Sequence, residues 1–80
     1  MTTDVEFRIA FCARTRALRR AQRLTMAEMA KELGVGVEAY RSYETRVMLP
    51  HHLVEKFCAR TGVAIETLFT GLRPVLRDRE

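Results

Sequence analysis

One short segment, residues 25–36, restricts the fold of this chain more than any other part of the sequence. Thr25 and Glu28 have the spacing of a capping box, which predicts that a helix begins there. Its apolar face is formed by Met29, Ala30 and Leu33. Gly34 is typical of the residue that ends a helix. The three residues Gly34, Val35 and Gly36 then form a tight connection to a second short helix, which we expect over residues 37–44. Two short helices joined in this way predict a helix-turn-helix.

The rest of the sequence also has helical periodicity, and it contains no alternating stretch long enough to predict a strand. Thr3 and Glu6 form a second capping-box pattern ahead of a long first helix. The expected helices cover residues 4–23, 25–33, 37–44, 50–61 and 64–69. The last of them is expected to bury Ile65 and Leu68. We therefore predict an all-α, five-helix domain over residues 1–71, followed by a C-terminal tail, residues 72–80.

Length and composition narrow the class of protein. With 80 residues, of which 48% are apolar, the chain can form one folded domain but not a substrate cavity roofed by a second domain. No run approaches the roughly 20 apolar residues of a membrane span. The N-terminal residues lack the layout of a signal peptide, so we expect a cytoplasmic protein with no membrane partner.

Chemistry-bearing residues are sparse. Cys12 and Cys58 lie far apart, without the spacing of metal ligands or of a disulfide scaffold. His51 and His52 are adjacent and would point about 100° apart on a helix, so they do not form a chelating pair. No catalytic motif or phosphate-binding loop is present in the sequence. We expect no enzyme activity, no metal or other cofactor and no small-molecule substrate.

Three separated blocks carry a family resemblance: Leu24–Val35, Tyr43-Glu44 and Gly62–Gly71. In their order and spacing they resemble the lambda-repressor-like (Cro/XRE-type) helix-turn-helix family, over roughly residues 7–71. The resemblance implies that the helix beginning at Val37 is a recognition helix for double-stranded DNA. It also implies that the helix beginning after Thr25 crosses the DNA backbone.

The resemblance further implies a partly buried ion pair between Arg19 on the first helix and Glu44 at the end of the recognition helix, which also orients the arginine toward a phosphate. Two unrelated surface charges are the alternative. The sequence departs from the family at two positions. Met26 stands where a glutamine usually contacts DNA, so that Thr25 and the helix N-terminus must hold the phosphate. Gly36 replaces the usual serine or threonine at the N-cap, where glycine is acceptable but poorer.

A recognition helix lying in the major groove would present four side chains to the bases: Val37, Glu38, Arg41 and Ser42. Arg41 can bond two acceptors of guanine, and Glu38 can accept a hydrogen bond from the cytosine amino group. Alternatively, these two side chains simply pair with each other on an exposed helix face. Contacts to the DNA backbone are expected from Thr25, Arg19, Arg23, Thr45 and Arg46.

The other basic residues of the first helix, Arg8, Arg16 and Arg20, are expected to form a solvated face. Residues 24–72 carry five basic and six acidic side chains, so a single copy would bind DNA weakly. We therefore expect a homodimer on an inverted repeat, with recognition helices about 34 Å apart. Met48 and Leu49 are more apolar than a loop requires. The candidate dimer interface consists of Phe69, Leu72, Val75 and Leu76, unless this tail folds back on its own core.

Together these features predict a sequence-specific DNA-binding transcriptional regulator, in the form of a repressor that occupies its operator as a homodimer. Two alternatives use the same fold. In an antitoxin the domain would bind both an operator and a toxin protein. In a protein-interaction adaptor it would bind a partner protein and no DNA.

Overall fold

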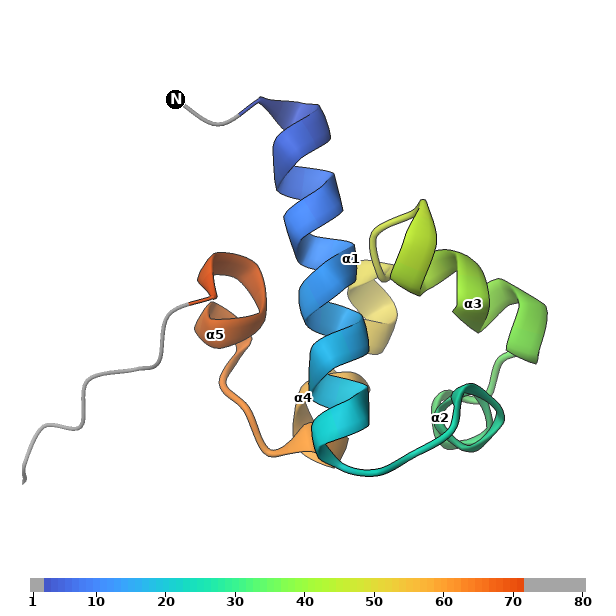
Figure 1. Ribbon diagram of the computed structural model, residues 1–80. Coiled ribbons are helices and arrows are strands. Elements are labelled where there is room, and N and C mark those ends of the chain that lie inside the picture. The colour runs from blue at the N-terminus through green and yellow to red at the C-terminus, as the bar shows by residue number, and fades with distance from the viewer. Residues whose placement is uncertain (1–2, 72–80) are drawn as a thin grey trace, which may run out of the picture.

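The computed structural model describes residues 3–71, which form five helices and no strand, so the predicted all-α class is confirmed. The helices are α1 (Asp4–Ala21), α2 (Met26–Leu33), α3 (Val37–Thr45), α4 (His51–Thr61) and α5 (Ile65–Thr70). Figure 1 shows α1 as the central element, with α2 and α3 on one side of it and α5 on the other. Helix α1 packs against α3 and α5, while α4 packs against α2 and α5. Among the described residues, no helix has the length and apolar character needed to cross a membrane.

Both predicted capping boxes are confirmed. The Oγ1 of Thr3 accepts a hydrogen bond from the N–H of Glu6 at 3.0 Å, and the Glu6 carboxylate accepts one from the N–H of Thr3 at 3.2 Å. The same reciprocal bonds join Thr25 and Glu28 at 3.0 and 2.8 Å. Each box gives partners to two backbone donors that the helix itself leaves unpaired. The starts of α1 and α2 are therefore set by residues within one turn of each other.

One apolar core receives a fully buried side chain from every helix. These side chains, each 0% exposed, are Phe11, Met29, Tyr40, Phe57 and Leu68. Burying an apolar side chain of this size contributes about 1.5–3 kcal/mol of transfer free energy. Since α5 has only six residues and α2 only eight, neither would be stable as an isolated helix. Contact with the common core holds them in place.

Helix α1 ends at Ala21, two residues before the predicted end at Arg23. The N–H of Arg23 donates to the carbonyl of Arg20 at 2.9 Å, and Arg23 has φ +60°, in the left-handed region. This turn directs the chain so that Leu24 packs against the core. The predicted end was wrong because arginine does not signal a left-handed turn in the way that glycine does.

Burial is informative at two further places, and at the second it contradicts the prediction. Leu49, in the connection between α3 and α4, is only 4% exposed, and Met48 packs against the core beside it. The apolar character of this connection therefore serves the chain's own core. Conversely, Ile65 was expected to be buried but is 49% exposed. The short helix α5 turns only one narrow face inward, and Leu68 occupies that face.

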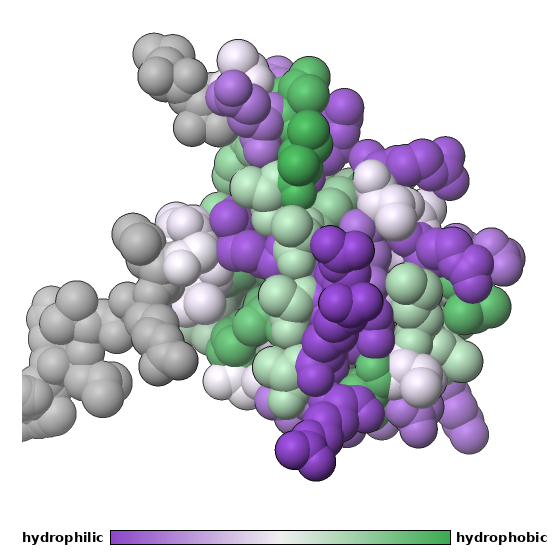
Figure 2. Space-filling view, viewed as in Figure 1, coloured by the Kyte–Doolittle hydropathy of each residue, from purple (hydrophilic) through white to green (hydrophobic). Residues whose placement is uncertain are grey.

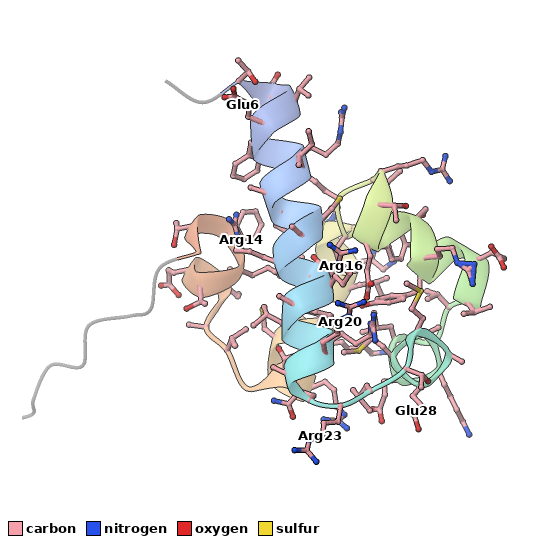
Figure 3. The ribbon with its side chains drawn as sticks, viewed as in Figure 1. Glu6, Arg14, Arg16, Arg20, Arg23 and Glu28 are labelled. Carbon is pink, nitrogen blue, oxygen red and sulfur yellow. The ribbon has the colours of Figure 1, made fainter. Side chains whose placement is uncertain are left out.

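The side chain of Arg14 fastens α5 to α1. Its Nε donates to the carbonyl of Leu68 and its Nη2 to the carbonyl of Phe69, both at 2.7 Å, and Figure 3 shows the side chain reaching from α1 toward α5. Carbonyls in the last turn of a helix lack internal donors, and a cation is favoured at this end. Gly71 follows with φ +78°, and a Cβ there would lie 3.2 Å from Nη1 of Arg14. Glycine at this position therefore provides both the backbone conformation and the space for the guanidinium.

Replacing Arg14 with alanine is expected to lower the free energy of unfolding by about 1–2 kcal/mol, because the variant loses two charge-assisted hydrogen bonds at the end of α5. Arg16→Ala is the matched control. Arg16 lies on the same helix, is exposed and takes part in no ion pair between described residues. Its replacement should change the free energy of unfolding by less than about 0.5 kcal/mol. Urea unfolding followed by circular dichroism measures both, and equal losses would contradict the role assigned to Arg14.

Candidate nucleic-acid interface

The ion pair expected between Arg19 and Glu44 is present and buried. The Nε of Arg19 lies 2.6 Å from Oε2 of Glu44, and Nη2 donates to Oε1 at 3.1 Å. The two side chains are 8% and 0% exposed. The Nη1 of Arg19 also donates to the carbonyl of Leu24, so that the same guanidinium holds the connection between α1 and α2. This two-bond geometry fixes both the distance and the direction of α3 relative to α1.

The bond to Glu44 keeps the Arg19 side chain in its charged form. The hydrogen bond with Glu44 raises the pKa of Arg19 above its usual value, although burial acts in the opposite direction. Tyr40 lies in the same buried cluster, where burial and then the neighbouring Glu44 carboxylate raise the pKa of its hydroxyl. The arginine therefore stays protonated and the tyrosine neutral at physiological pH.

The sequence also predicts that Arg19 contacts the DNA backbone. All three guanidinium nitrogens donate hydrogen bonds within the chain, and the side chain is only 8% exposed. A contact with a phosphate would have to use the remaining N–H groups at the edge of the guanidinium. The main role of Arg19 in this structure is to position α3.

The face of α3 that points away from the ion pair is open to solvent. The side chain of Glu38 is 81% exposed and that of Arg41 is 49% exposed, and their charged groups lie 3.5 Å apart. Such an exposed pair contributes only a few tenths of a kcal/mol, so exchanging it for contacts with a ligand costs little. Val37 is half-buried and packs against the core. Of the predicted base-reading residues, Glu38 and Arg41 are thus the most accessible.

The two predicted hydroxyl residues of α3 bond to their own helix. The Oγ of Ser42 donates to the carbonyl of Ala39 at 2.6 Å, and Oγ1 of Thr45 donates to the carbonyl of Arg41 at 3.1 Å. Either hydroxyl would have to rotate before it could donate to DNA. Ala39 is also exposed on α3. Its small side chain gave no reason in the sequence to expect a contact with DNA.

The remaining predicted contacts to the DNA backbone are exposed and lie in the connections that flank α2 and α3. Arg23 and Thr25 belong to the connection from α1 to α2, and Figure 3 shows Arg23 at the end of α1. Arg46 follows the C-terminal end of α3. The Glu28 carboxylate occupies the N-terminus of α2, where it accepts the N–H of Thr25. A phosphate at this helix end would meet that negative charge, which weakens the predicted contact from Thr25.

The predicted dimer interface is described at one residue only. Phe69 is 36% exposed, and its ring packs edge-on against Phe11 with 5.0 Å between ring centroids. Part of this side chain therefore belongs to the chain's own core. Leu72, Val75 and Leu76 lie outside the described residues.

Residues that could bind a metal ion do not come together in residues 3–71. No cluster of three or more His, Cys, Asp or Glu side chains there is placed to hold a metal ion. His51 and His52 are both exposed, and their rings stand almost perpendicular to each other. Burial raises the pKa of both thiols, Cys12 and Cys58, so that neither is an activated nucleophile.

Arg19→Ala is expected to lower the free energy of unfolding by about 3–5 kcal/mol, because it leaves the Glu44 carboxylate buried without a partner. The double variant Arg19→Met/Glu44→Met removes both charges and should be substantially more stable than Arg19→Ala alone. Thermal and urea unfolding of wild type and both variants provide the comparison. A loss below about 1 kcal/mol for Arg19→Ala, or a double variant no more stable than it, would show that burial of the unpaired charge is not the cause.

Comparison with protein-family models, with curated proteins and with solved structures finds no match for this chain. The family resemblance seen in the sequence therefore stays a hypothesis, and the functional interpretation depends on the geometry of the described residues. The most informative feature is α3. One face of this helix is fixed to the core by Tyr40 and Glu44, and the other exposes Glu38 and Arg41.

Proposed function

We propose that the protein is a sequence-specific DNA-binding regulator of transcription, in the form of a repressor, and that α2 and α3 act as its helix-turn-helix. The observation that carries this proposal is the two-sided character of α3. Its inner face is held by the buried pair of Glu44 and Arg19, while its outer face exposes Glu38 and Arg41. A helix that is already fixed can enter a major groove without losing further backbone entropy, which favours affinity.

The arrangement of the two short helices supports the same proposal. Figure 1 shows α2 end-on while α3 lies across the view, so their axes are steeply inclined. The helices are joined by the three residues Gly34, Val35 and Gly36, and Gly34 has φ +77°. In a helix-turn-helix this geometry allows one helix to cross the DNA backbone while the other lies in the groove.

Recognition would replace the exposed pair of Glu38 and Arg41 with contacts to bases. Arg41 would donate two hydrogen bonds to guanine, and Glu38 would accept one from a cytosine amino group. Arg23 and Arg46 would neutralise phosphates, which makes affinity depend on salt concentration. Because few cations face the DNA, we propose that two copies bind an inverted repeat in the cytoplasm, with their recognition helices about 34 Å apart.

One observation favours an alternative function. Glu38 neutralises part of the charge on Arg41, and Glu28 places a carboxylate at the N-terminus of α2. A surface with so little net positive charge also suits an adaptor that binds another protein, or an antitoxin that binds both a toxin and DNA. Co-purification with a toxin, together with loss of the toxin's activity in that complex, would favour the antitoxin.

The proposed function is tested by selecting bound duplexes from a random DNA pool at about 0.15 M salt, followed by anisotropy titrations. We expect an enriched inverted repeat, bound roughly a thousandfold or more tightly than scrambled DNA. No enrichment, or equal binding to all duplexes, would contradict sequence-specific regulation and favour the adaptor.

The same titrations include one variant of the outer face of α3 and one control. Arg41→Ala should weaken the free energy of DNA binding by about 1–3 kcal/mol and reduce the preference for one base at one position of the site. Lys56→Ala removes an exposed positive charge from α4 and should leave the sequence preference unchanged. If both variants behave alike, Arg41 does not read bases.

Arg23→Gly is expected to stabilise the protein but weaken DNA binding. Relief of the left-handed strain should exceed the added freedom of glycine in the unfolded chain, with a net gain of about 0.5–1 kcal/mol. Loss of one phosphate contact should lower the DNA affinity by the same factor for all sequences. It should also reduce the number of counterions released on binding by about one, which lowers the slope of affinity against salt concentration. Thermal unfolding and salt-dependent titrations measure the two effects. Unchanged salt dependence would show that Arg23 does not contact a phosphate.

A further inference from the structure

The solvent face of α1 carries two kinds of side chain, one after the other along the helix. We define the α1 stripe as Val5, Ile9, Ala13, Arg16 and Arg20, all of which are exposed. At about 100° per residue these five positions fall within a strip roughly 80° wide. The first half of the stripe is apolar and the second half is basic. Phe11 and Thr15 face the core from the other side of the helix.

No other part of residues 3–71 covers this stripe. Val5 and Ile9 are 54% and 63% exposed and do not belong to the core cluster. Neither Arg16 nor Arg20 takes part in any of the three ion pairs formed between described residues. Figure 2 shows apolar side chains over the N-terminal end of α1 and a hydrophilic ridge over its C-terminal half. Figure 3 shows Arg16 and Arg20 projecting from the same side of the helix.

We propose that the α1 stripe binds a helical segment of another protein, one that carries apolar side chains at one end and acidic side chains at the other. Arg16 and Arg20 are one turn apart and can each form a two-bond pair with a carboxylate. Val5 and Ile9, also one turn apart, bury apolar area against the other end of the segment. Since the two halves differ in character, only one direction of the bound helix matches both.

The same order of side chains disfavours a second copy of this chain. If two stripes met in antiparallel orientation, Val5 and Ile9 of each copy would face the arginines of the other. In parallel orientation, Arg16 and Arg20 would face their own copies, and like charges repel. An acidic segment avoids both conflicts.

Two other kinds of partner fit less well. A DNA backbone would pair with the arginines but would leave Val5 and Ile9 without apolar contacts. A helix that lies in a membrane interface needs apolar side chains along its whole length, with cations on the flanking face. In the α1 stripe the apolar and basic halves follow each other along the axis, so half of the face would oppose insertion.

The test begins with a display library of helical peptides whose surface positions are randomised. The peptides have about 20 residues, a length at which an isolated helix can form in water. The full-length protein serves as bait. We expect enriched peptides with acidic side chains toward one end and apolar side chains toward the other. A library that yields no enriched peptide, or only peptides without acidic residues, overturns the proposal.

Binding of an enriched peptide is then measured by fluorescence titration against charge variants. Arg16→Glu/Arg20→Glu should weaken binding by at least about tenfold, because two attractive pairs become repulsive. The matched control Lys31→Glu/Lys56→Glu changes the net charge by the same amount at exposed positions of α2 and α4, and should retain binding within about twofold. Circular dichroism establishes that both variants are folded. Equal losses in the two variants overturn the proposal.

A charge exchange gives the sharpest result. A peptide whose acidic residues are replaced with lysine should bind the Arg16→Glu/Arg20→Glu variant better than wild type, and failure of this rescue overturns the proposal. The inference does not depend on the proposed DNA binding, because Arg41→Ala should leave peptide affinity unchanged. If Arg16→Glu/Arg20→Glu instead removes binding to the selected duplex or to anionic phospholipid vesicles, and the peptides fail to compete, the stripe serves DNA or a membrane and the proposal is wrong.

Discussion

The buried pair of Arg19 and Glu44 is the interaction on which the arrangement of the helices depends most. It joins α1 to α3, and through the carbonyl of Leu24 it also fixes the connection that leads into α2. Two opposite charges removed from water are stable only when both are present and well oriented, so the pair tolerates few relative positions of its helices. Tyr40 packs beside it at 0% exposure and closes this region to solvent.

This anchoring explains how a short helix can present a defined surface. Helix α3 has nine residues, and its N-cap, Gly36, offers no side-chain hydrogen bond, so α3 depends on tertiary contacts for its stability. Because those contacts use one face, Glu38 and Arg41 remain exposed on the other. Helix α1 is divided in the same way, since Arg14 fastens α5 while the α1 stripe points to solvent. The ion pair thereby sets the relative position of both candidate interfaces.

The candidate site could be predicted in part. Helical periodicity places Tyr40 on the inner face of α3 and Glu38 on the outer one, whereas the burial of Glu44 was expected only from the family resemblance. Periodicity does not show how polar groups pair, and the hydrogen bond from the Ser42 hydroxyl to the carbonyl of Ala39 was not expected. Arg14 lies three residues after the buried Phe11, so periodicity places it at the edge of the apolar stripe but does not show which carbonyls its guanidinium meets.

The sequence by itself determined, to within about one residue, where the helices begin, and it determined which side chains cap α1 and α2. The box of Thr25 and Glu28 depends only on groups within one turn, and such local chemistry can be seen in the order of residues. Tertiary structure alone decided that Arg14 holds α5 and that Leu49 enters the core. It also decided that Arg23 adopts a left-handed turn. These features join groups as many as 55 residues apart or serve the packing of distant helices, and no local pattern encodes such contacts.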